Sequence, residues 1–119
     1  MSKTITVYGI PNCDSVKKAC AWLQQRGIEH QFHDFKKQGL PLDRVDRWLA
    51  AAGWETLLNR KGTTWRKLDS ATQAGVVDAA SARALMERET SVIRRPVVEW
   101  RDSVTVGFDP GRWEQIAGR

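Results

Sequence analysis

The first third of the chain alternates apolar runs with glycine-containing turns in a pattern that predicts a strand, a helix and a second strand. Residues 4–8 are β-branched or aromatic and end at Gly9, as in a buried strand. Apolar residues then recur at the spacing of one helix face over residues 16–23, and Gly27 supplies a stop. Residues 30–35 are typical of a second strand. Because a helix separates the two strands, we expect a parallel, right-handed βαβ unit.

The remainder of the chain predicts helices followed by a hairpin. Helical spacing begins at Pro41 and ends at Gly53, residues 54–68 are mixed, and residues 78–89 indicate a further helix. Residues 97–106 contain two strand-like runs around a short turn, which predicts an antiparallel hairpin. A short helix is expected around residues 112–117.

This element order is typical of an α/β protein with a thioredoxin-like fold. The βαβ unit and the C-terminal antiparallel hairpin would form one small mixed sheet, with a helical insertion at about residues 40–90. A chain of 119 residues with 41% hydrophobic content has the size of one compact domain. We therefore expect a single thioredoxin-like domain over residues 1–119.

Composition and net charge limit the kinds of partner and the cellular compartment that we expect. The net charge of +5 favours anionic ligands in general. Lysines and arginines are spread along the whole sequence without a basic stripe, so we predict no nucleic-acid binding. No apolar stretch has the length of a membrane span and no signal peptide is visible, so no membrane association is expected. Two cysteines fit a reducing compartment, and we predict a cytoplasmic protein.

Cys13 is the candidate nucleophile. It lies just after the first predicted strand and just before the first helix, so unpaired backbone N–H groups and the positive end of the helix dipole should face its sulfur. Such a position favours the thiolate, which is the nucleophilic form of cysteine. Lys17 adds positive charge about one turn away. The alternative is a passive turn cysteine, and we favour the catalytic interpretation.

Cys20 is predicted to be structural because it shares the apolar face of the helix. About 10 Å of helix would separate it from Cys13, which is too far for a disulfide. The motif Cys13-Asp14-Ser15-Val16 has no second cysteine, so a resolving thiol must come from outside. With so few Cys and His residues, no metal site is predicted.

Seven blocks extend over nearly the whole chain, at residues 8–10, 13–19, 33–36, 58–60, 62–68, 95–97 and 106–108. Together they resemble the ArsC-like (arsenate reductase) family, more closely its YffB subgroup, which is related to Spx. In arsenate reductases the cysteine attacks an oxyanion held by arginines, and the resemblance places Arg60 and Arg95 at two of those positions. Arg94 would take the place of Arg95 if the register differs by one residue.

Other features complete the predicted site. Asn12 and Lys17, which flank Cys13, are assigned with Arg60 and Arg95 to anion binding. The resemblance also suggests that the bond between Arg95 and Pro96 is cis, although the sequence alone leaves the isomer open.

The sequence departs from true arsenate reductases at two positions. Gly9 stands where they carry a histidine, and their third arginine falls near Phe108 or Asp109. The YffB subgroup implies a glutathione-dependent thiol reductase instead, with glutathione as co-substrate and no bound cofactor. Its reductant would be glutathione or a glutaredoxin-like protein, and its substrate a small thiol, a disulfide or an oxyanion. The alternatives are an arsenate reductase proper and an Spx-like regulatory protein that binds RNA polymerase, against which the missing Cys-x-x-Cys motif counts.

Overall fold

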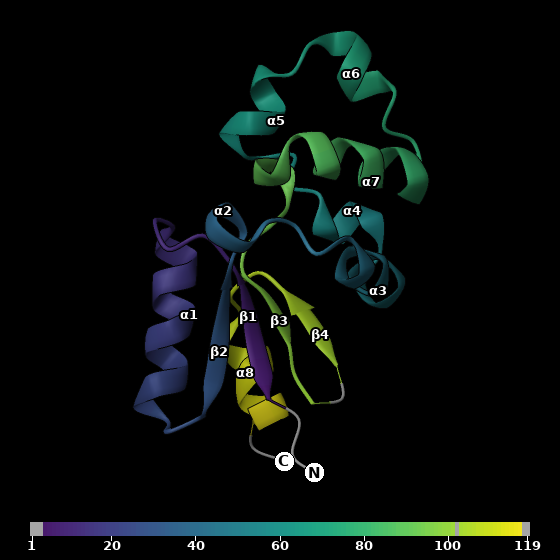
Figure 1. Ribbon diagram of the computed structural model, residues 1–119. Coiled ribbons are helices and arrows are strands. Elements are labelled where there is room, and N and C mark those ends of the chain that lie inside the picture. The colour runs from purple at the N-terminus through teal and green to yellow at the C-terminus, as the bar shows by residue number, and fades with distance from the viewer. Residues whose placement is uncertain (1–3, 102, 118–119) are drawn as a thin grey trace.

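The structure, a computed structural model, describes residues 4–101 and 103–117 (Figure 1). Its four strands are β1 (Ile5–Gly9), β2 (His30–Asp34), β3 (Val97–Glu99) and β4 (Val104–Val106). The helices are α1 (Asp14–Gln25), α2 (Phe35–Gln38), α3 (Leu42–Ala52), α4 (Trp54–Leu57), α5 (Thr63–Lys67), α6 (Ser70–Ala74), α7 (Ala79–Arg88), the 3₁₀ turn η1 (Thr90–Val92) and α8 (Pro110–Ala117).

The strands form one mixed sheet in the order β2-β1-β3-β4. β1 and β2 are parallel, with Gly9 opposite Asp34 at their carboxyl ends. β3 is antiparallel to β1, with Tyr8 opposite Val97, and β3 and β4 form the closing hairpin. The predicted α/β class, the parallel βαβ unit and the antiparallel hairpin of a thioredoxin-like fold are therefore confirmed.

Helices cover the two faces of the sheet. α1 and α8 pack on one face, where Val7 of β1 and Val98 of β3 meet Leu23 and Trp113 in a buried cluster. α3 packs on the other face and contributes Trp48 to a second cluster. The periodicity that predicted α1 follows from this packing, because its buried residues are the ones that face the sheet.

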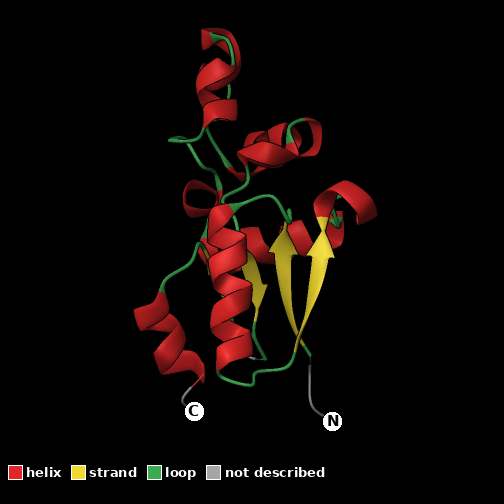
Figure 2. Cartoon of the chain, turned by 90° about the vertical axis from the view of Figure 1, so that its left-hand side faces the viewer, coloured by secondary structure: helices red, strands yellow, loops and turns green. Residues whose placement is uncertain are grey.

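The segment between β2 and β3 is helical and lies mostly beyond the edge of the sheet at which β1 and β2 end (Figures 1 and 2). Within this segment, a short antiparallel pairing that we call the clasp joins residues 57–59 to residues 92–94. Leu58 and Ile93 form an isolated bridge, Asn59 N donates to Val92 O over 2.8 Å, and Arg94 N donates to Leu57 O over 2.8 Å. The clasp delivers the chain to the start of β3, so residues 94 and 95 lie at this edge.

Some elements differ from the prediction, and at α2 local capping explains the difference. Phe35 begins α2 instead of ending the strand, because the Asp34 side chain accepts a hydrogen bond of 2.9 Å from Lys36 N and caps the helix. α8 begins at Pro110, two residues earlier than expected. The mixed region at residues 54–68 forms α4 and α5. The bond between Arg95 and Pro96 is cis, as the resemblance suggested.

Candidate functional site

Cys13 occupies the N-cap of α1. Its backbone is extended, with φ −143° and ψ 123°, and its carbonyl accepts the first helical hydrogen bond, 2.9 Å from Lys17 N. The N–H groups of the first turn have no carbonyl earlier in the helix to bond, so they and the helix dipole favour negative charge at this end. Cys13 is half-buried and free. The structure therefore places this thiol at the positive end of the α1 dipole.

Gly9 fixes how closely the Cys13 loop packs on the sheet. A Cβ at Gly9 would lie 2.8 Å from Val16 Cγ2 and 3.8 Å from the Cβ of Arg95. Val16 is only 2% exposed and is held by the core, so it has little room to retreat. The absence of a side chain at Gly9 thus lets the end of β1, the start of α1 and the approach to β3 meet.

A pocket of about 550 Å³ opens beside the start of α1. It is lined by Ser15, Thr56, Arg94, Arg95, Val106, Gly107, Phe108 and Asp109. Cys13 is not among the lining residues, whereas Ser15, two residues further along the chain, is. The pocket therefore adjoins the N-terminus of the helix that Cys13 caps.

Both arginines that the sequence left as alternatives face this pocket. Arg94 Nε donates a hydrogen bond to Thr56 O over 3.2 Å, which holds its side chain along one wall. Arg95 Nε is buried and has no hydrogen-bond partner among the described residues. A buried donor without a partner is costly, and an anionic ligand would satisfy it. The pair thus places two guanidinium groups in the pocket lining, and only the Nε of Arg95 lacks a partner.

A carboxylate stands at one of the two positions to which the resemblance assigned the third arginine of arsenate reductases. Asp109 lines the pocket, and its Oδ1 accepts a hydrogen bond from Arg112 N over 3.2 Å at the start of α8. Phe108, the other candidate position, packs edge-on against Trp113 with ring centroids 5.0 Å apart. The lining therefore combines two cations with one anion and differs from a site in which three arginines hold an oxyanion.

The other predicted anion-binding residues lie outside the lining of this pocket. Arg60 is exposed, and its Cζ lies 5.2 Å from the centroid of the Trp54 ring. In the clasp, the chain leaves Asn59 in the direction away from Arg94, so Arg60 and Arg95 are not brought together. Asn12 and Lys17 are exposed on either side of Cys13.

Sequence reasoning missed a buried carboxylate on the face of the sheet under α3. Glu99 is 8% exposed and accepts hydrogen bonds from Tyr8 Oη over 3.1 Å and Trp48 Nε1 over 2.9 Å. Arg44 Nη1 lies 3.6 Å from its Oε1. Burial and the neighbouring Glu99 charge raise the pKa of Tyr8 to about 12. An acidic residue inside the apolar run of the third strand was the signal available.

Cys20 packs beside the cluster of α1 and α8, as predicted. Burial raises the pKa of its thiol, which disfavours the reactive thiolate. Both cysteines are free. The environments of the two sulfurs therefore differ, as a mechanism with Cys13 as the single nucleophile requires.

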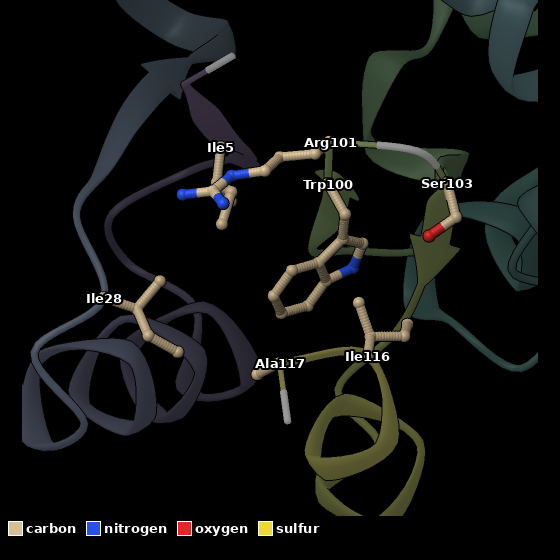
Figure 3. Close-up of a pocket in the computed structure, with 7 residues that line it drawn as sticks. All are labelled: Ile5, Ile28, Trp100, Arg101, Ser103, Ile116 and Ala117. Atoms are coloured by element: carbon tan, nitrogen blue, oxygen red, sulfur yellow. The ribbon is translucent and has the colours of Figure 1, made fainter. Parts of the chain in front are cut away.

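A second cavity, of about 400 Å³, lies at the opposite edge of the sheet, where β1 begins and β3 ends (Figure 3). It is lined by Ile5, Ile28, Trp100, Arg101, Ser103, Ile116 and Ala117. It offers no thiol and one charged side chain, so it has no part in the chemistry of Cys13. Across residues 4–101 and 103–117, no group of three potential metal ligands gathers, and no helix is long and apolar enough to cross a membrane.

Comparison with known proteins connects this geometry to a family. The model of the ArsC family matches residues 8–116. The chain belongs to the ArsC family. Among solved structures, this ArsC-family chain is similar to the YffB (PA3664) protein, with 43% identity and a TM-score of 0.90, over 95% of this chain and 98% of the other. It is also similar to an arsenate reductase (ArsC) related protein from Brucella melitensis, with 47% identity and a TM-score of 0.75, over 100% and 98% of the two chains.

Curated relatives of this ArsC-family chain include an uncharacterized protein and a transcriptional regulator. An uncharacterized protein of Haemophilus influenzae is 36% identical over 110 residues, which are 92% of this chain and 96% of the relative. The global transcriptional regulator Spx of Listeria innocua is 23% identical over 107 residues, which are 88% of this chain and 80% of the relative. The predicted likeness to YffB and the relation to Spx are therefore both confirmed.

Proposed function

We propose that this protein is a glutathione-dependent thiol reductase of the cytoplasm that uses Cys13 as its only nucleophile. The observation that carries the proposal is the position of Cys13 at the N-cap of α1, beside a pocket that contains Arg94 and the unpartnered Arg95 Nε. The positive end of the helix dipole lies at the Cys13 sulfur, and the guanidinium groups attract an anionic thiol. Glutathione, with two carboxylates, is such a thiol.

The reaction is an exchange of disulfide bonds in three steps. The Cys13 thiolate attacks one sulfur of a substrate disulfide, its S–S bond breaks, and the second sulfur leaves as a thiolate that takes a proton from water. The thiolate of glutathione then attacks the substrate sulfur bound to Cys13. This step restores the Cys13 thiolate and releases the substrate sulfur in a mixed disulfide with glutathione. A second glutathione thiolate then attacks the glutathione sulfur of this mixed disulfide, which releases the remaining substrate sulfur as a thiolate and forms oxidised glutathione. Two glutathione molecules thus supply the two electrons that reduce the substrate disulfide, and no second protein thiol is required.

Arg94 and Arg95 would hold a carboxylate of glutathione, whereas Asp109 would face its ammonium group. A guanidinium fork suits a carboxylate, and one anion beside two cations suits a zwitterion. Arg60, Asn12 and Lys17 stay proposed contributors to the charge around Cys13. Arg60 would have to leave Trp54 to reach a ligand held by Arg95.

Arsenate as the main substrate is the weaker alternative. The lining of the pocket has a carboxylate in place of a third arginine. A histidine at Gly9 would have to displace Val16. A regulatory role like that of Spx is the other alternative, supported by the similarity to the Listeria protein. In that case Cys13 would have no turnover with glutathione, and binding of RNA polymerase would be the function.

The test is the glutathione-dependent reduction of bis(2-hydroxyethyl) disulfide, coupled to glutathione reductase and NADPH. We expect turnover by the wild type and by Cys20→Ala, and none by Cys13→Ser. Arg95→Ala should raise KM for glutathione roughly tenfold or more, because a charge-assisted pair is lost. Arg47→Ala, an exposed arginine of α3, is the matched control and should leave KM unchanged.

Three results would count against the proposal. Activity that survives in Cys13→Ser would show that Cys13 is not the nucleophile. Turnover of arsenate to arsenite, well above the disulfide reaction, would favour the arsenate reductase. An inactive wild type that binds RNA polymerase in a pull-down would favour the regulator.

A further inference from the structure

The fold collects cations that are scattered in the sequence. β1 and β2 are parallel, so the start of α1 and the whole of α2, which follow these strands, lie at the same edge of the sheet (Figures 1 and 2). Lys17 and Lys18 are exposed in the first turns of α1, and Lys36 and Lys37 are exposed in α2. Four lysines therefore flank the loop that carries Cys13.

A second group of cations lies beyond the same edge. Arg60 and Lys61 follow the clasp, and Arg66 and Lys67 end α5, which both views place above this edge. All four are exposed. With the four lysines of α1 and α2, these cations form what we call the basic edge. Its eight residues and the two pocket arginines are ten of the 19 lysines and arginines in the chain.

The positive charge of the basic edge is not neutralised locally. In the part of the chain that the structure describes, Arg26, Arg44 and Arg83 form ion pairs, but no cation of the basic edge does. Asp14, in the first turn of α1, opposes this charge, whereas two other nearby carboxylates cap helices: Asp34 accepts from Lys36 N and Asp69 from Thr72 N. The field around Cys13 is therefore positive and open to solvent.

The size and chemistry of this surface indicate a protein partner. A tripeptide spans only about 10 Å, whereas these cations belong to three separate elements, so a thiol the size of glutathione leaves most of them unused. Nucleic acid fits poorly, because the exposed large apolar side chains in the described residues are Leu42 and Val77, which offer no ring for stacking on bases. A nucleic acid also offers Cys13 no sulfur to attack.

We infer that the substrate on which Cys13 acts is a protein disulfide set in an acidic surface, which docks on the basic edge. The inference rests on the proposed function and names the substrate class of the same site. The reaction is the exchange already described: the protein disulfide is reduced, and glutathione supplies the electrons. The basic edge accelerates the docking of this acidic surface.

The experiment measures the rate at which Cys13 attacks three 2-pyridyl disulfides, by release of 2-thiopyridone. One is on a cysteine peptide flanked by glutamates, one is on the same peptide flanked by lysines, and one is the neutral 2-hydroxyethyl 2-pyridyl disulfide. We expect the wild type to react with the glutamate peptide roughly tenfold faster than with the lysine peptide at low salt. The preference should vanish as salt rises from about 0.02 M to about 0.5 M.

Charge-reversal variants test which residues cause the preference for the glutamate peptide. Lys36→Glu with Lys37→Glu, and Arg66→Glu with Lys67→Glu, should each remove most of the preference while the neutral disulfide reacts at the wild-type rate. Arg47→Glu with Arg101→Glu changes the net charge equally at exposed positions outside the basic edge and should retain the preference. The neutral variants Lys36→Gln and Lys37→Gln repeat the test if a reversal unfolds the chain.

The outcomes separate the two proposals. If the neutral disulfide reacts with Cys13 but both peptides react alike, the docking inference is wrong and the reductase stands. The docking inference is also wrong if single-stranded DNA blocks Cys13 more strongly than polyglutamate does. If none of the three disulfides reacts, the proposed function fails, and the inference fails with it.

Discussion

Trp48 Nε1 donates a hydrogen bond of 2.9 Å to Glu99 Oε2 and so ties α3 to the third strand across 51 positions of sequence. The second oxygen of the same carboxylate accepts from Tyr8. This buried carboxylate therefore holds three elements together on the face of the sheet opposite α1. Its energetics can be tested separately from the chemistry of Cys13.

Glu99→Ala is expected to destabilise the protein by about 3 kcal/mol, because it leaves two buried donors and the Arg44 charge without their acceptor. Urea unfolding followed by tryptophan fluorescence measures this loss. Glu99→Gln keeps one acceptor oxygen and should cost less. Equal stability of Glu99→Ala and the wild type would mean that water replaces the carboxylate without cost.

Tyr8 should make stability fall at high pH. Its pKa rises from 10.0 to about 12 in the folded protein, so the unfolded chain loses this proton first. The stabilisation is fully present below pH 10 and is lost as pH rises through about 12. Between about pH 9 and about pH 11 the wild type should lose about 1 kcal/mol more than Tyr8→Phe does, as measured by urea unfolding. Parallel pH profiles of the two proteins would contradict this assignment.

Gly9→Ala should destabilise the protein by roughly 1–3 kcal/mol, because the added methyl group meets Val16 Cγ2 in a packed site. The double variant Gly9→Ala with Val16→Ala should lose less stability than the sum of the losses in the two single variants. Thermal unfolding of the four proteins gives the coupling. Additive effects would show that the strain is relieved elsewhere.

The two cysteines should react with iodoacetamide at different rates near neutral pH. Cys13 caps a helix and should be alkylated first, whereas burial raises the pKa of Cys20 and should slow its reaction. Mass spectrometry of the two peptides measures both rates in one sample. In urea the rates should converge, which is the control. Faster labelling of Cys20 in the folded protein would contradict the assignment of the nucleophile.

Local pattern was sufficient to predict the sheet and α1. The apolar spacing of Val16, Ala19 and Leu23 is the spacing of the buried face, and the β-branched runs are the strands. The short helix α2 was harder to predict because a single capping bond decides where it begins. The side chain of Asp34 converts Phe35 from a strand residue into the first residue of α2.

The site was predictable in part. The position of Cys13 between strand and helix identified the candidate thiol. Arg94 and Arg95 were both retained by the sequence argument, and only the clasp shows that both reach the same pocket. Arg60 was paired with Arg95 by resemblance, yet the clasp directs it toward Trp54.

The gathering of cations at one edge of the sheet was likewise not predictable from the sequence. Lysines and arginines are spread evenly in the sequence, and no local pattern marks them as a group. The parallel strands and the clasp bring ten of 19 to one edge. Such a gathering depends on contacts between distant residues, which the sequence does not display.

The clasp has a consequence for the integrity of the chain. Residues 60–91 form a loop whose two ends are joined by the backbone bridge between Leu58 and Ile93. Apolar side chains of this loop are part of the same core as Tyr8. A protease that cuts within an exposed turn of this loop would therefore produce a nicked protein whose two fragments remain associated. Cys13 and Arg95 would then belong to different polypeptides and still lie at the same edge of an intact sheet.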